Sequence, residues 1–159
     1  MVPGSPVSKA VADEEYVLAD SGVVSRLTAI SKDSSAYHQW IGTRRIAISF
    51  QTEAELLGCN FVASRMQRLN DLLATILKLS PAEATIVWYA RVSEKKREFQ
   101  KTNHIAGEAG EGDIWIISTA LEHGLDLISH DGPAVQLARA MALRVFTNLP
   151  ALRGGNPTQ

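Results

Sequence analysis

Short apolar runs alternate along the chain with longer stretches in which apolar residues recur at helical spacing. The run Tyr16–Ala19 ends at the turn signal Asp20-Ser21-Gly22, and apolar residues then return on one helical face up to Ile30. A short continuous apolar run is typical of a buried strand, whereas a period of about 3.6 residues is typical of a helix with one buried face. We therefore predict a strand followed by a helix at the start of the domain.

Later apolar runs extend this pattern. The predicted strands are Tyr16–Ala19, Ile46–Ser49, a short strand near 84–86, Leu125–Ile128 and Arg144–Thr147. The third of these is ambiguous, because Ala84–Val87 also fits the opening of the helix that continues to Lys101.

Helical stretches separate the predicted strands. After Ile46–Ser49, an apolar stripe continues to Ser80-Pro81, where proline removes a backbone donor and ends the helix or starts another. Further helices are predicted up to Lys101, from Asp113 to His123 and over Pro133–Met141, with a glycine-rich loop at 107–112. Strands that alternate with helices predict an α/β fold with a mainly parallel sheet covered by helices.

Length and composition favour one compact domain. The chain has 159 residues, of which 45% are hydrophobic and 21% are charged, enough to bury one sizeable core. We place the domain at 15–150, with flexible tails at 1–14 and 151–159, where proline, glycine and polar residues show no apolar periodicity. No apolar run approaches the roughly 20 residues that cross a bilayer, so we expect a cytoplasmic protein without a membrane partner.

The distribution of charge is more informative than its sum. A formal net charge of -1 argues against a protein that holds nucleic acid by charge alone. Basic residues nevertheless concentrate in one predicted helix, at Arg91, Lys95, Lys96, Arg97 and Lys101. This group fits either a local basic face for nucleic acid or an ordinary solvated helix surface.

Acidic residues stand where predicted strands and helices meet. They are Asp20 after the first strand, Glu55 in a first helical turn, Asp113 at a helix start and Asp131 after the strand Leu125–Ile128. Ligands of parallel sheets bind beyond the carboxyl ends of the strands. Unit charges about 4 Å apart repel by roughly 4 kcal/mol at an effective dielectric constant of 20, so a shared site requires a cation. Carboxylate oxygens suit Mg²⁺ or Mn²⁺, and the chain has neither the cysteine cluster nor the HExxH spacing of zinc sites.

Each acid also has a purely structural interpretation. Thr52 and Glu55 fit a T-x-x-E capping box, and Asp113 fits a first-turn acid that complements the helix dipole. Asp20 fits a helix cap, and Asp131 lies in an ordinary Asp-Gly-Pro turn. The residues alone leave the metal site and these local roles open.

The motifs resemble the PIN-domain family, in particular the VapC-like toxins of bacterial toxin–antitoxin pairs. The matching segments read YVLADSGVV, AISFQTEAELLG, GDIWIISTALEHGLDLISHD and RVFTNLP, in the family's order and over residues 16–150. The resemblance implies a three-layer α/β/α domain. It also selects Glu55 over Glu53 as the second acid, because Glu55 occupies the glutamate of the family's A-E-L motif and Glu53 should face another side of the helix.

The activity implied by this resemblance is metal-dependent endoribonuclease activity, as in the toxin of a type II toxin–antitoxin pair. RNA phosphodiester bonds would be hydrolysed by a water activated by Mg²⁺ or Mn²⁺. The implied catalytic metal ligands are Asp20, Glu55, Asp113 and Asp131, supported by Ser21 and Thr119. The basic helix would steer RNA, and the implied protein partners are a small antitoxin and a second copy of the chain.

Departures from the family pattern keep a second function open. Gly22 stands where relatives often carry asparagine or serine, and Ile117 replaces a small residue one turn after Asp113. These changes suit a catalytically inactive PIN-like module that binds protein or RNA. Simple local roles also exist for the supporting residues, a turn for Ser21 and a back-bonding hydroxyl for Thr119.

Other chemistry is disfavoured by what surrounds the first acid. A haloacid dehalogenase-like enzyme needs a second aspartate at Gly22, and a response regulator needs adjacent acids where Ala19-Asp20 stands. Among the histidines, His104 and His123 are candidate acids or bases, and the position of His123 at a helix end favours a structural role.

Overall fold

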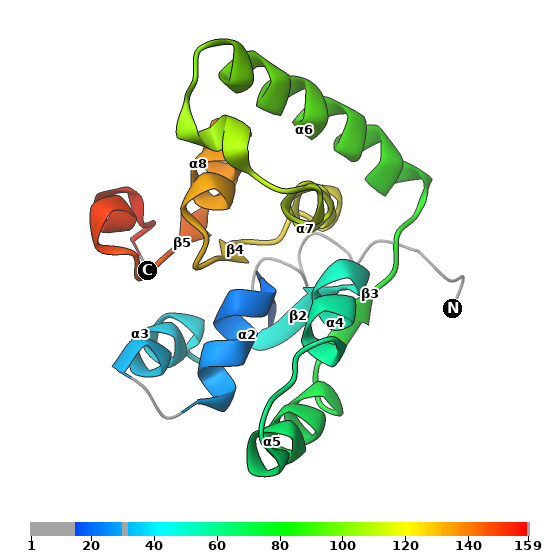
Figure 1. The fold of residues 1–159 in the computed structure, drawn as a ribbon, viewed down its shortest axis with the longest axis vertical. Helices are drawn as coiled ribbons and strands as arrows, with labels where there is room; N and C mark the ends of the chain where they lie inside the picture. Colours follow the sequence, from blue (N-terminus) through cyan, green and yellow to red (C-terminus); the bar gives the residue numbers. More distant parts are fainter. Residues whose placement is uncertain (1–14, 30–31, 159) are drawn as a thin grey trace.

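The central sheet is parallel throughout the part of the chain that the structure describes. The computed structural model describes residues 15–29 and 32–158, so the predicted tail at 1–14 lies outside it. The strands are β1 (Tyr16–Ala19), β2 (Arg45–Ser49), β3 (Leu77–Leu79), β4 (Leu127–Ile128) and β5 (Val145–Phe146). Their order is β3-β2-β1-β4-β5, and every pair is parallel (Figure 1). This confirms the predicted mainly parallel sheet.

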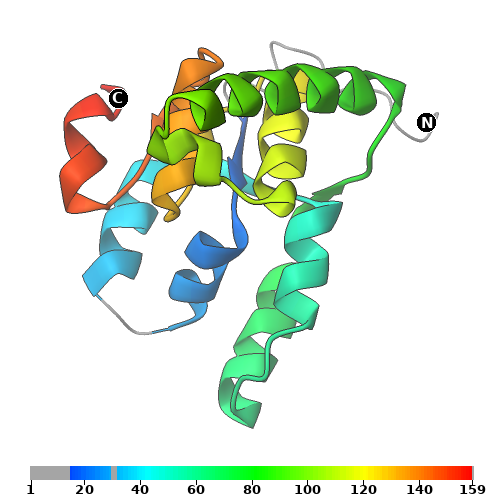
Figure 2. The same ribbon diagram turned by 45° about the horizontal axis from the view of Figure 1, so that its top comes forward.

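Helices cover both faces of the sheet. One face carries α2 (Ser21–Thr28), α3 (Lys32–Ile41), α4 (Phe50–Leu57) and α5 (Ala63–Leu73). The other carries α6 (Glu83–Lys101), the 3-10 helix η1 (Ile105–Glu108), α7 (Glu111–His123) and α8 (Gly132–Ala140), with α6 lying across α7 (Figure 2).

Alternation along β1 shows how one strand serves both cores. Val17 and Ala19 belong to the apolar cluster beneath α2–α5, whereas Leu18 belongs to the cluster beneath α6–α8. All three side chains are fully buried. A strand buried on both faces reads as a continuous apolar run, which explains the pattern of Tyr16–Ala19. The predicted three-layer α/β/α fold is confirmed.

The predicted strand near 84–86 is wrong. Those residues lie in α6, where the Thr85 hydroxyl accepts a hydrogen bond from the Ala82 backbone N–H (2.8 Å). The third strand is Leu77–Leu79, at the edge of the sheet beside β2. Leu77 and its predecessors continue the helical spacing of the preceding stripe, so this three-residue strand has no periodicity of its own.

Order extends past the predicted domain boundary at 150. A second 3-10 helix, η2 (Pro150–Gly155), covers most of the predicted C-terminal tail. The Asn156 side chain accepts hydrogen bonds from Arg139 Nη2 (3.0 Å) and the Thr147 N–H (2.9 Å), and it donates to the Thr147 carbonyl (2.9 Å). Because these contacts join residue 156 to β5, the packed domain includes η2.

Replacing Asn156 should therefore weaken the whole domain. We expect Asn156→Ala to lower the free energy of unfolding by about 2 kcal/mol, because it leaves the buried backbone groups of Thr147 without partners. Urea unfolding measures this change. Thr158→Ala is the matched control, since exposed Thr158 contributes only its backbone carbonyl, to Arg144. Equal stability of the two variants would contradict the anchoring role of Asn156.

Within 15–29 and 32–158, no helix has the length and apolarity needed to cross a lipid bilayer.

Candidate metal centre

The predicted site acids all stand at the carboxyl edge of the sheet. Asp20 follows β1 and caps α2, and Asp131 follows β4 and caps α8. Glu55 lies on α4, the helix that leaves the end of β2, and Asp113 lies in the first turn of α7. Parallel strands deliver the starts of α2, α4 and α8 to one edge. α7 follows η1 instead of a strand, and it packs against α4.

Electrostatic coupling shows that the carboxyl groups are near neighbours. Burial raises the pKa of Asp113 to about 6, and the negative charges of Asp131, Asp20 and Glu55 add to this effect. The hydrogen bond from the Gly110 N–H opposes it. The structure thus gathers the four acids into one group, which we call the acid cluster.

Asp20 is the buried member of the acid cluster. Its Oδ1 accepts from the Val23 N–H (2.8 Å) and its Oδ2 accepts from the His130 N–H (3.0 Å). Burial raises the pKa of Asp20, while these N–H groups and the Ser129 hydroxyl lower it. The negative charge of Asp131 raises it further. Asp20 is therefore held in a fixed orientation, with both oxygens directed by the backbone.

Three acids also perform the local roles that the sequence allows. Asp20 and Asp131 are helix caps, with Asp131 Oδ1 accepting from the Ala134 N–H (2.9 Å), and Asp113 Oδ2 accepts from the Gly110 N–H (2.8 Å). Each of the last two caps uses one oxygen. In the described part of the chain, the second carboxylate oxygen of Asp113 and of Asp131 accepts no hydrogen bond. Capping and ligand binding are thus compatible here.

The capping-box interpretation of Glu55 is wrong. Ser49 caps α4 by accepting from the Thr52 N–H (3.1 Å), which places Glu55 one turn later than predicted. Its carboxylate instead accepts hydrogen bonds from the Ser21 hydroxyl and from Gln51 Nε2 (2.9 Å). Glu53 pairs with Lys78 (2.9 Å), so the choice of Glu55 over Glu53 agrees with the faces these residues present.

A glycine makes the approach of α7 to α4 possible. A Cβ atom on Gly112 would lie 2.7 Å from Glu55 Oε1 and 2.9 Å from Gln51 Nε2. Both distances are shorter than van der Waals contact. The residue next to Asp113 must therefore lack a side chain for Glu55 to keep its present position.

We expect Gly112→Ala to separate metal binding from stability. The colliding atoms are the ends of two flexible side chains, which can move, and alanine favours the helix by up to about 1 kcal/mol. Stability in EDTA should be unchanged or higher, while Mn²⁺ affinity falls about 10–100-fold, the range for groups that orient a metal ligand. Calorimetric titration and urea unfolding measure the two effects. Gly154→Ala, where the added Cβ meets nothing within 4 Å, should change neither, and unaltered Mn²⁺ affinity in Gly112→Ala would refute the expectation.

The donor set suits a hydrated cation better than a closed cage. Among the described residues, no three histidine, cysteine, aspartate or glutamate side chains lie close enough to hold one metal ion directly. Mg²⁺ retains several waters and is commonly bound through one or two carboxylates. The neighbouring carboxylates repel one another, and this repulsion contributes to the raised pKa of Asp113. A hydrated cation would offset that repulsion. The chemistry of the site therefore fits Mg²⁺ or Mn²⁺.

Gly22 and Ile117, the residues that depart from the family pattern, and the supporting residue Thr119 can each be located in the structure. Gly22 lies beside Asp20, and a Cβ there would be 3.5 Å from Asp20 Oδ1, which is ordinary contact. Ile117 is fully buried in the apolar cluster beneath α6–α8. Thr119 is buried and donates to the Trp115 carbonyl (2.8 Å), the back-bonding role that the sequence also allowed.

Sequence reasoning missed the neighbours that orient the acids. The His130 ring is hydrogen-bonded to the buried Tyr37 hydroxyl, which also accepts from the Asn148 N–H (3.1 Å). Tyr37 lies far from His130 in the chain, so no sequence spacing could have revealed the pair. The contact between Gln51 and Glu55 could have been predicted, because residues four apart on a helix are neighbours.

The predicted basic helix is α6. Arg91 lies over the Trp88 ring (5.0 Å to its centroid), and Lys95 Nζ is 3.0 Å from Glu98 Oε2. Arg91, Arg97 and Lys101 are exposed, whereas Lys95 and Lys96 are half-buried. These contacts are compatible with a solvated surface, and RNA binding by this helix stays a prediction.

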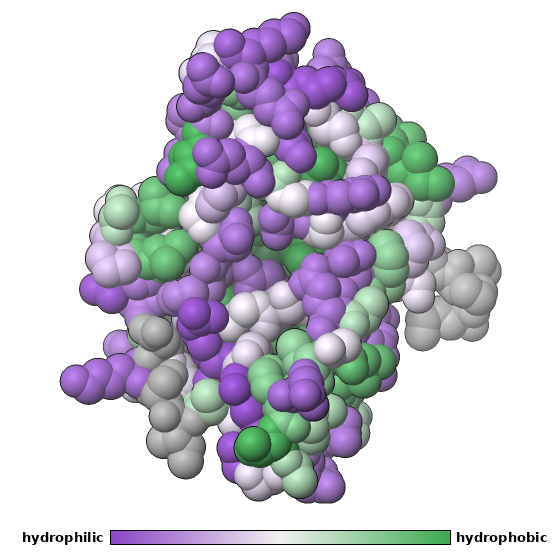
Figure 3. Space-filling model, viewed as in Figure 1, coloured by the Kyte–Doolittle hydropathy of each residue, from purple (hydrophilic) through white to green (hydrophobic). Residues whose placement is uncertain are grey.

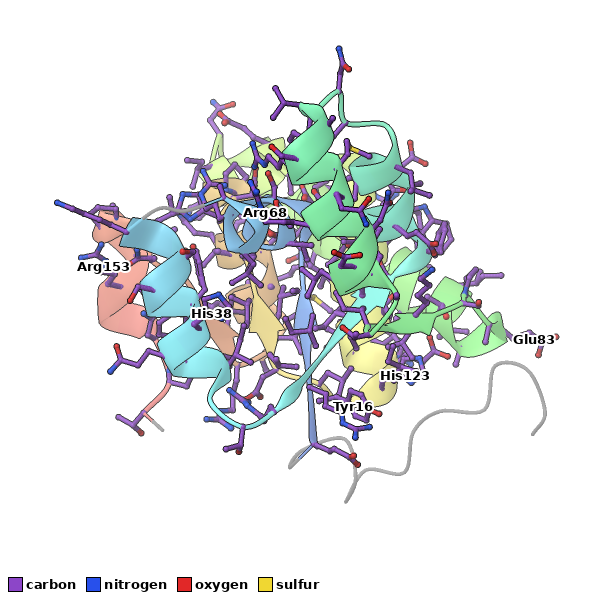
Figure 4. The ribbon with its side chains drawn as sticks, turned by 90° about the horizontal axis from the view of Figure 1, so that it is seen from below. Tyr16, His38, Arg68, Glu83, His123 and Arg153 are labelled. Atoms are coloured by element: carbon purple, nitrogen blue, oxygen red, sulfur yellow. The ribbon has the colours of Figure 1, made fainter. Side chains whose placement is uncertain are left out.

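Neither candidate histidine belongs to the acid cluster. His104 caps η1 by accepting from the Ala106 N–H (3.1 Å). His123 is buried at the C-terminal end of α7, opposite the end that carries Asp113 (Figure 4). Burial lowers the pKa of His123, although the nearby Glu122 carboxylate opposes this. A role for His123 in chemistry at the acid cluster is therefore excluded by its position.

Comparison with known proteins places the fold. No family model matches the chain, and no curated protein matches its sequence. Solved structures do match. VapBC2 from Rickettsia felis bound to a promoter DNA fragment aligns with TM-score 0.62 and 15% identity, over 83% of this chain and 98% of that one. This chain has the fold of the matched VapBC structure.

Further matches come from other bacteria. VapBC-1 from nontypeable Haemophilus influenzae aligns with TM-score 0.60 and 22% identity, over 83% of this chain and 97% of that one. FitAcB from Neisseria gonorrhoeae aligns with TM-score 0.61 and 22% identity, over 82% and 96%. At these identities the likeness concerns the fold, and it confirms the PIN-like architecture that the motifs predict.

Proposed function

We propose that this chain is a metal-dependent endoribonuclease. The observation that carries the proposal is the acid cluster, in which burial and the charges of Asp131, Asp20 and Glu55 raise the pKa of Asp113, and burial and the charge of Asp131 raise the pKa of Asp20. Such a group is costly for the fold unless a cation binds to it. The fold shared with toxin–antitoxin structures supports the same conclusion.

The residues of the acid cluster have distinct parts in this proposal. Asp113 and Asp131 offer the oxygens that accept no other hydrogen bond, and Asp20 supplies a rigid buried carboxylate. Glu55 is oriented by Ser21 and Gln51. A bound Mg²⁺ or Mn²⁺ would supply charge neutralisation at the scissile phosphate and a lower pKa for an attacking water. None of the four carboxylates needs to act as a covalent nucleophile.

We further propose that the chain is the toxin of a toxin–antitoxin pair and that it forms a homodimer. One matched structure is described as a member of the VapBC family of toxin–antitoxin systems. Exposed apolar side chains offer surface for partners, at Leu57 and Val62 on the α4–α5 arm and at Ile86 and Val87 on α6. Figure 3 shows hydrophobic patches at these two places. Co-purification with the product of an adjacent gene tests the antitoxin, and sedimentation tests the dimer.

A second candidate is a catalytically inactive PIN-like interaction module in the cytoplasm. Its support is Gly22 beside Asp20, and the lack of a direct three-residue metal group among the described residues. Such a module would bind RNA or protein without cutting it. Metal titration separates the candidates, because the nuclease must bind Mg²⁺ or Mn²⁺ at the acid cluster.

The decisive assay is cleavage of defined RNAs with and without Mg²⁺ or Mn²⁺. Wild type should cut in the presence of metal and stop in EDTA, whereas Asp20→Ala and Asp113→Ala should not cut. Glu53→Gln is the matched control, because Glu53 lies on the same helix as Glu55 but pairs with Lys78. Cleavage that persists in both alanine variants would show that the acid cluster is not the nuclease centre.

A further inference from the structure

Aromatic side chains from three helices, two of which also carry site acids, meet one another and have no part in the chemistry proposed above. They are Phe50 on α4, Tyr89 on α6 and Trp115 on α7, and all three are half-buried. The Trp115 ring centroid is 4.2 Å from that of Tyr89 and 5.5 Å from that of Phe50, with the latter pair edge to face. We call these residues the aromatic cluster.

The aromatic cluster is attached to the elements that carry the acids. Trp115 follows Asp113 by two residues, and Phe50 immediately precedes Gln51, whose amide holds Glu55. The Tyr89 hydroxyl donates to Glu111 Oε1 (3.3 Å), in the same first turn of α7 as Asp113. Two residues of the aromatic cluster and two residues of the acid cluster, Glu55 and Asp113, therefore lie on the same pair of helices, α4 and α7.

Partial exposure distinguishes these rings from the core on the same helix. Ile114, Ile116 and Ile117 of α7 are buried in the apolar cluster beneath α6–α8. Trp115 on the same helix is only half-buried, so part of its ring is exposed to solvent. Partly exposed aromatic rings beside a phosphodiester-binding centre are suited to stacking with nucleobases, because every base has a π-face.

The charge beside the rings indicates which part of a nucleotide fits there. Glu111 is exposed and places a carboxylate at the aromatic cluster. A phosphate group would be repelled at this position, whereas the amino group of a base would find a hydrogen-bond acceptor. The occupant that matches both the rings and the charge is a base.

We propose that the aromatic cluster binds one unpaired nucleobase of the RNA strand whose phosphodiester bond lies at the acid cluster. This inference rests on the proposed function in that RNA is the substrate. The base must be unpaired, because a base within a duplex exposes no free face for stacking. The aromatic cluster would thus position the strand while the acid cluster performs the hydrolysis.

The test compares two single-stranded RNAs that differ only in one base. One oligonucleotide is intact and the other carries an abasic site, so both have the same phosphates. Fluorescence anisotropy in EDTA, in the Asp113→Asn background, measures binding without cutting. We expect about tenfold weaker binding of the best-placed abasic strand, since stacking on an aromatic side chain contributes about 1–3 kcal/mol per base.

Variants locate the base on the protein. Phe50→Leu and Tyr89→Leu should bind the intact strand about tenfold more weakly and remove the preference for it over the abasic strand. Trp115→Leu should do the same if it folds, which thermal unfolding establishes. Trp88→Leu is the matched control, a half-buried tryptophan on α6 whose ring faces Arg91 instead. It should keep the preference, even if overall RNA affinity changes.

The outcomes separate this inference from the nuclease proposal. Equal binding of intact and abasic strands at every abasic position, by the Asp113→Asn protein with its aromatic cluster unchanged, overturns the base site, whether or not wild type cuts RNA. Loss of preference in Trp88→Leu equal to that in Tyr89→Leu overturns it as well. A preference that depends on Phe50 and Tyr89 supports the base site, and the absence of metal-dependent cleavage would then refute only the nuclease.

Discussion

Asp113→Asn should abolish RNA cleavage and at the same time stabilise the metal-free protein at pH 8. Activity should fall at least about 100-fold, which exceeds the effect of losing a group that only orients a ligand. Stability should rise because the wild-type carboxylate is ionised at pH 8 in a site that disfavours its charge. Asparagine remains able to accept the cap hydrogen bond from the Gly110 N–H but carries no charge.

The sign of this effect follows from the raised pKa. The folded-state pKa of Asp113 is about 6, above the ordinary value of 3.8. Its stabilising contribution is therefore complete below about pH 4 and is lost as the pH rises through about 6. We expect a gain of about 1–2 kcal/mol for the variant at pH 8, after discounting for the partial exposure of the carboxyl group. The difference should vanish near pH 4.

Urea unfolding in EDTA at pH 8 and pH 4, together with the cleavage assay, measures both parts of this prediction. Glu53→Gln should leave cleavage and the pH dependence of stability unchanged, because Glu53 lies outside the acid cluster. A variant that is inactive but less stable at pH 8 would contradict the electrostatic account. A stabilised variant that still cuts would contradict the catalytic one.

Saturating Mn²⁺ should raise the melting temperature strongly at pH 7.5 and only slightly at pH 5. Protons and metal compete for the same carboxylates, and burial raises the pKa of both Asp20 and Asp113. A ligand at 100 times its Kd contributes about 2.7 kcal/mol to stability. For a domain of this size, that corresponds to about 5–10 °C.

Differential scanning fluorimetry at both pH values checks this expectation. The shift at pH 7.5 should disappear in Asp113→Asn and remain in Glu53→Gln. An equal shift at pH 5 and pH 7.5 would mean that Mn²⁺ binds elsewhere, at groups that do not titrate in this range.

The sequence predicts most of the fold because the hydrophobic pattern of most elements fits either a strand or a helix, and not both. Tyr16–Ala19 and Ile46–Ser49 are apolar runs that stop at turn residues, and both are strands in the structure. Leu77–Leu79 escaped prediction because it continues the helical spacing of α5 and forms only a short edge strand. Tertiary pairing with β2 decides its conformation, and no local pattern encodes that pairing.

The candidate site was likewise predictable only in part: local patterns indicate the acids, whereas tertiary contacts decide their orientation. Positions at strand ends predict Asp20 and Asp131, and the family resemblance selects Glu55 over Glu53. The contacts that orient them, such as Ser21 to Glu55 and Tyr37 to His130, join residues far apart in the chain. They arise only once the sheet and its helices have assembled, and therefore lie beyond the reach of sequence spacing.

Direct Mn²⁺ binding tests the central claim, that the acid cluster is a metal centre. Electron paramagnetic resonance of free Mn²⁺, measured at pH 7.5 with increasing protein, counts the ions bound by wild type, Asp20→Asn, Asp113→Asn and Glu53→Gln. The account predicts saturable binding in wild type and Glu53→Gln, and its loss in the other two variants. Binding that survives in Asp20→Asn and Asp113→Asn, or that is missing in wild type, would contradict it.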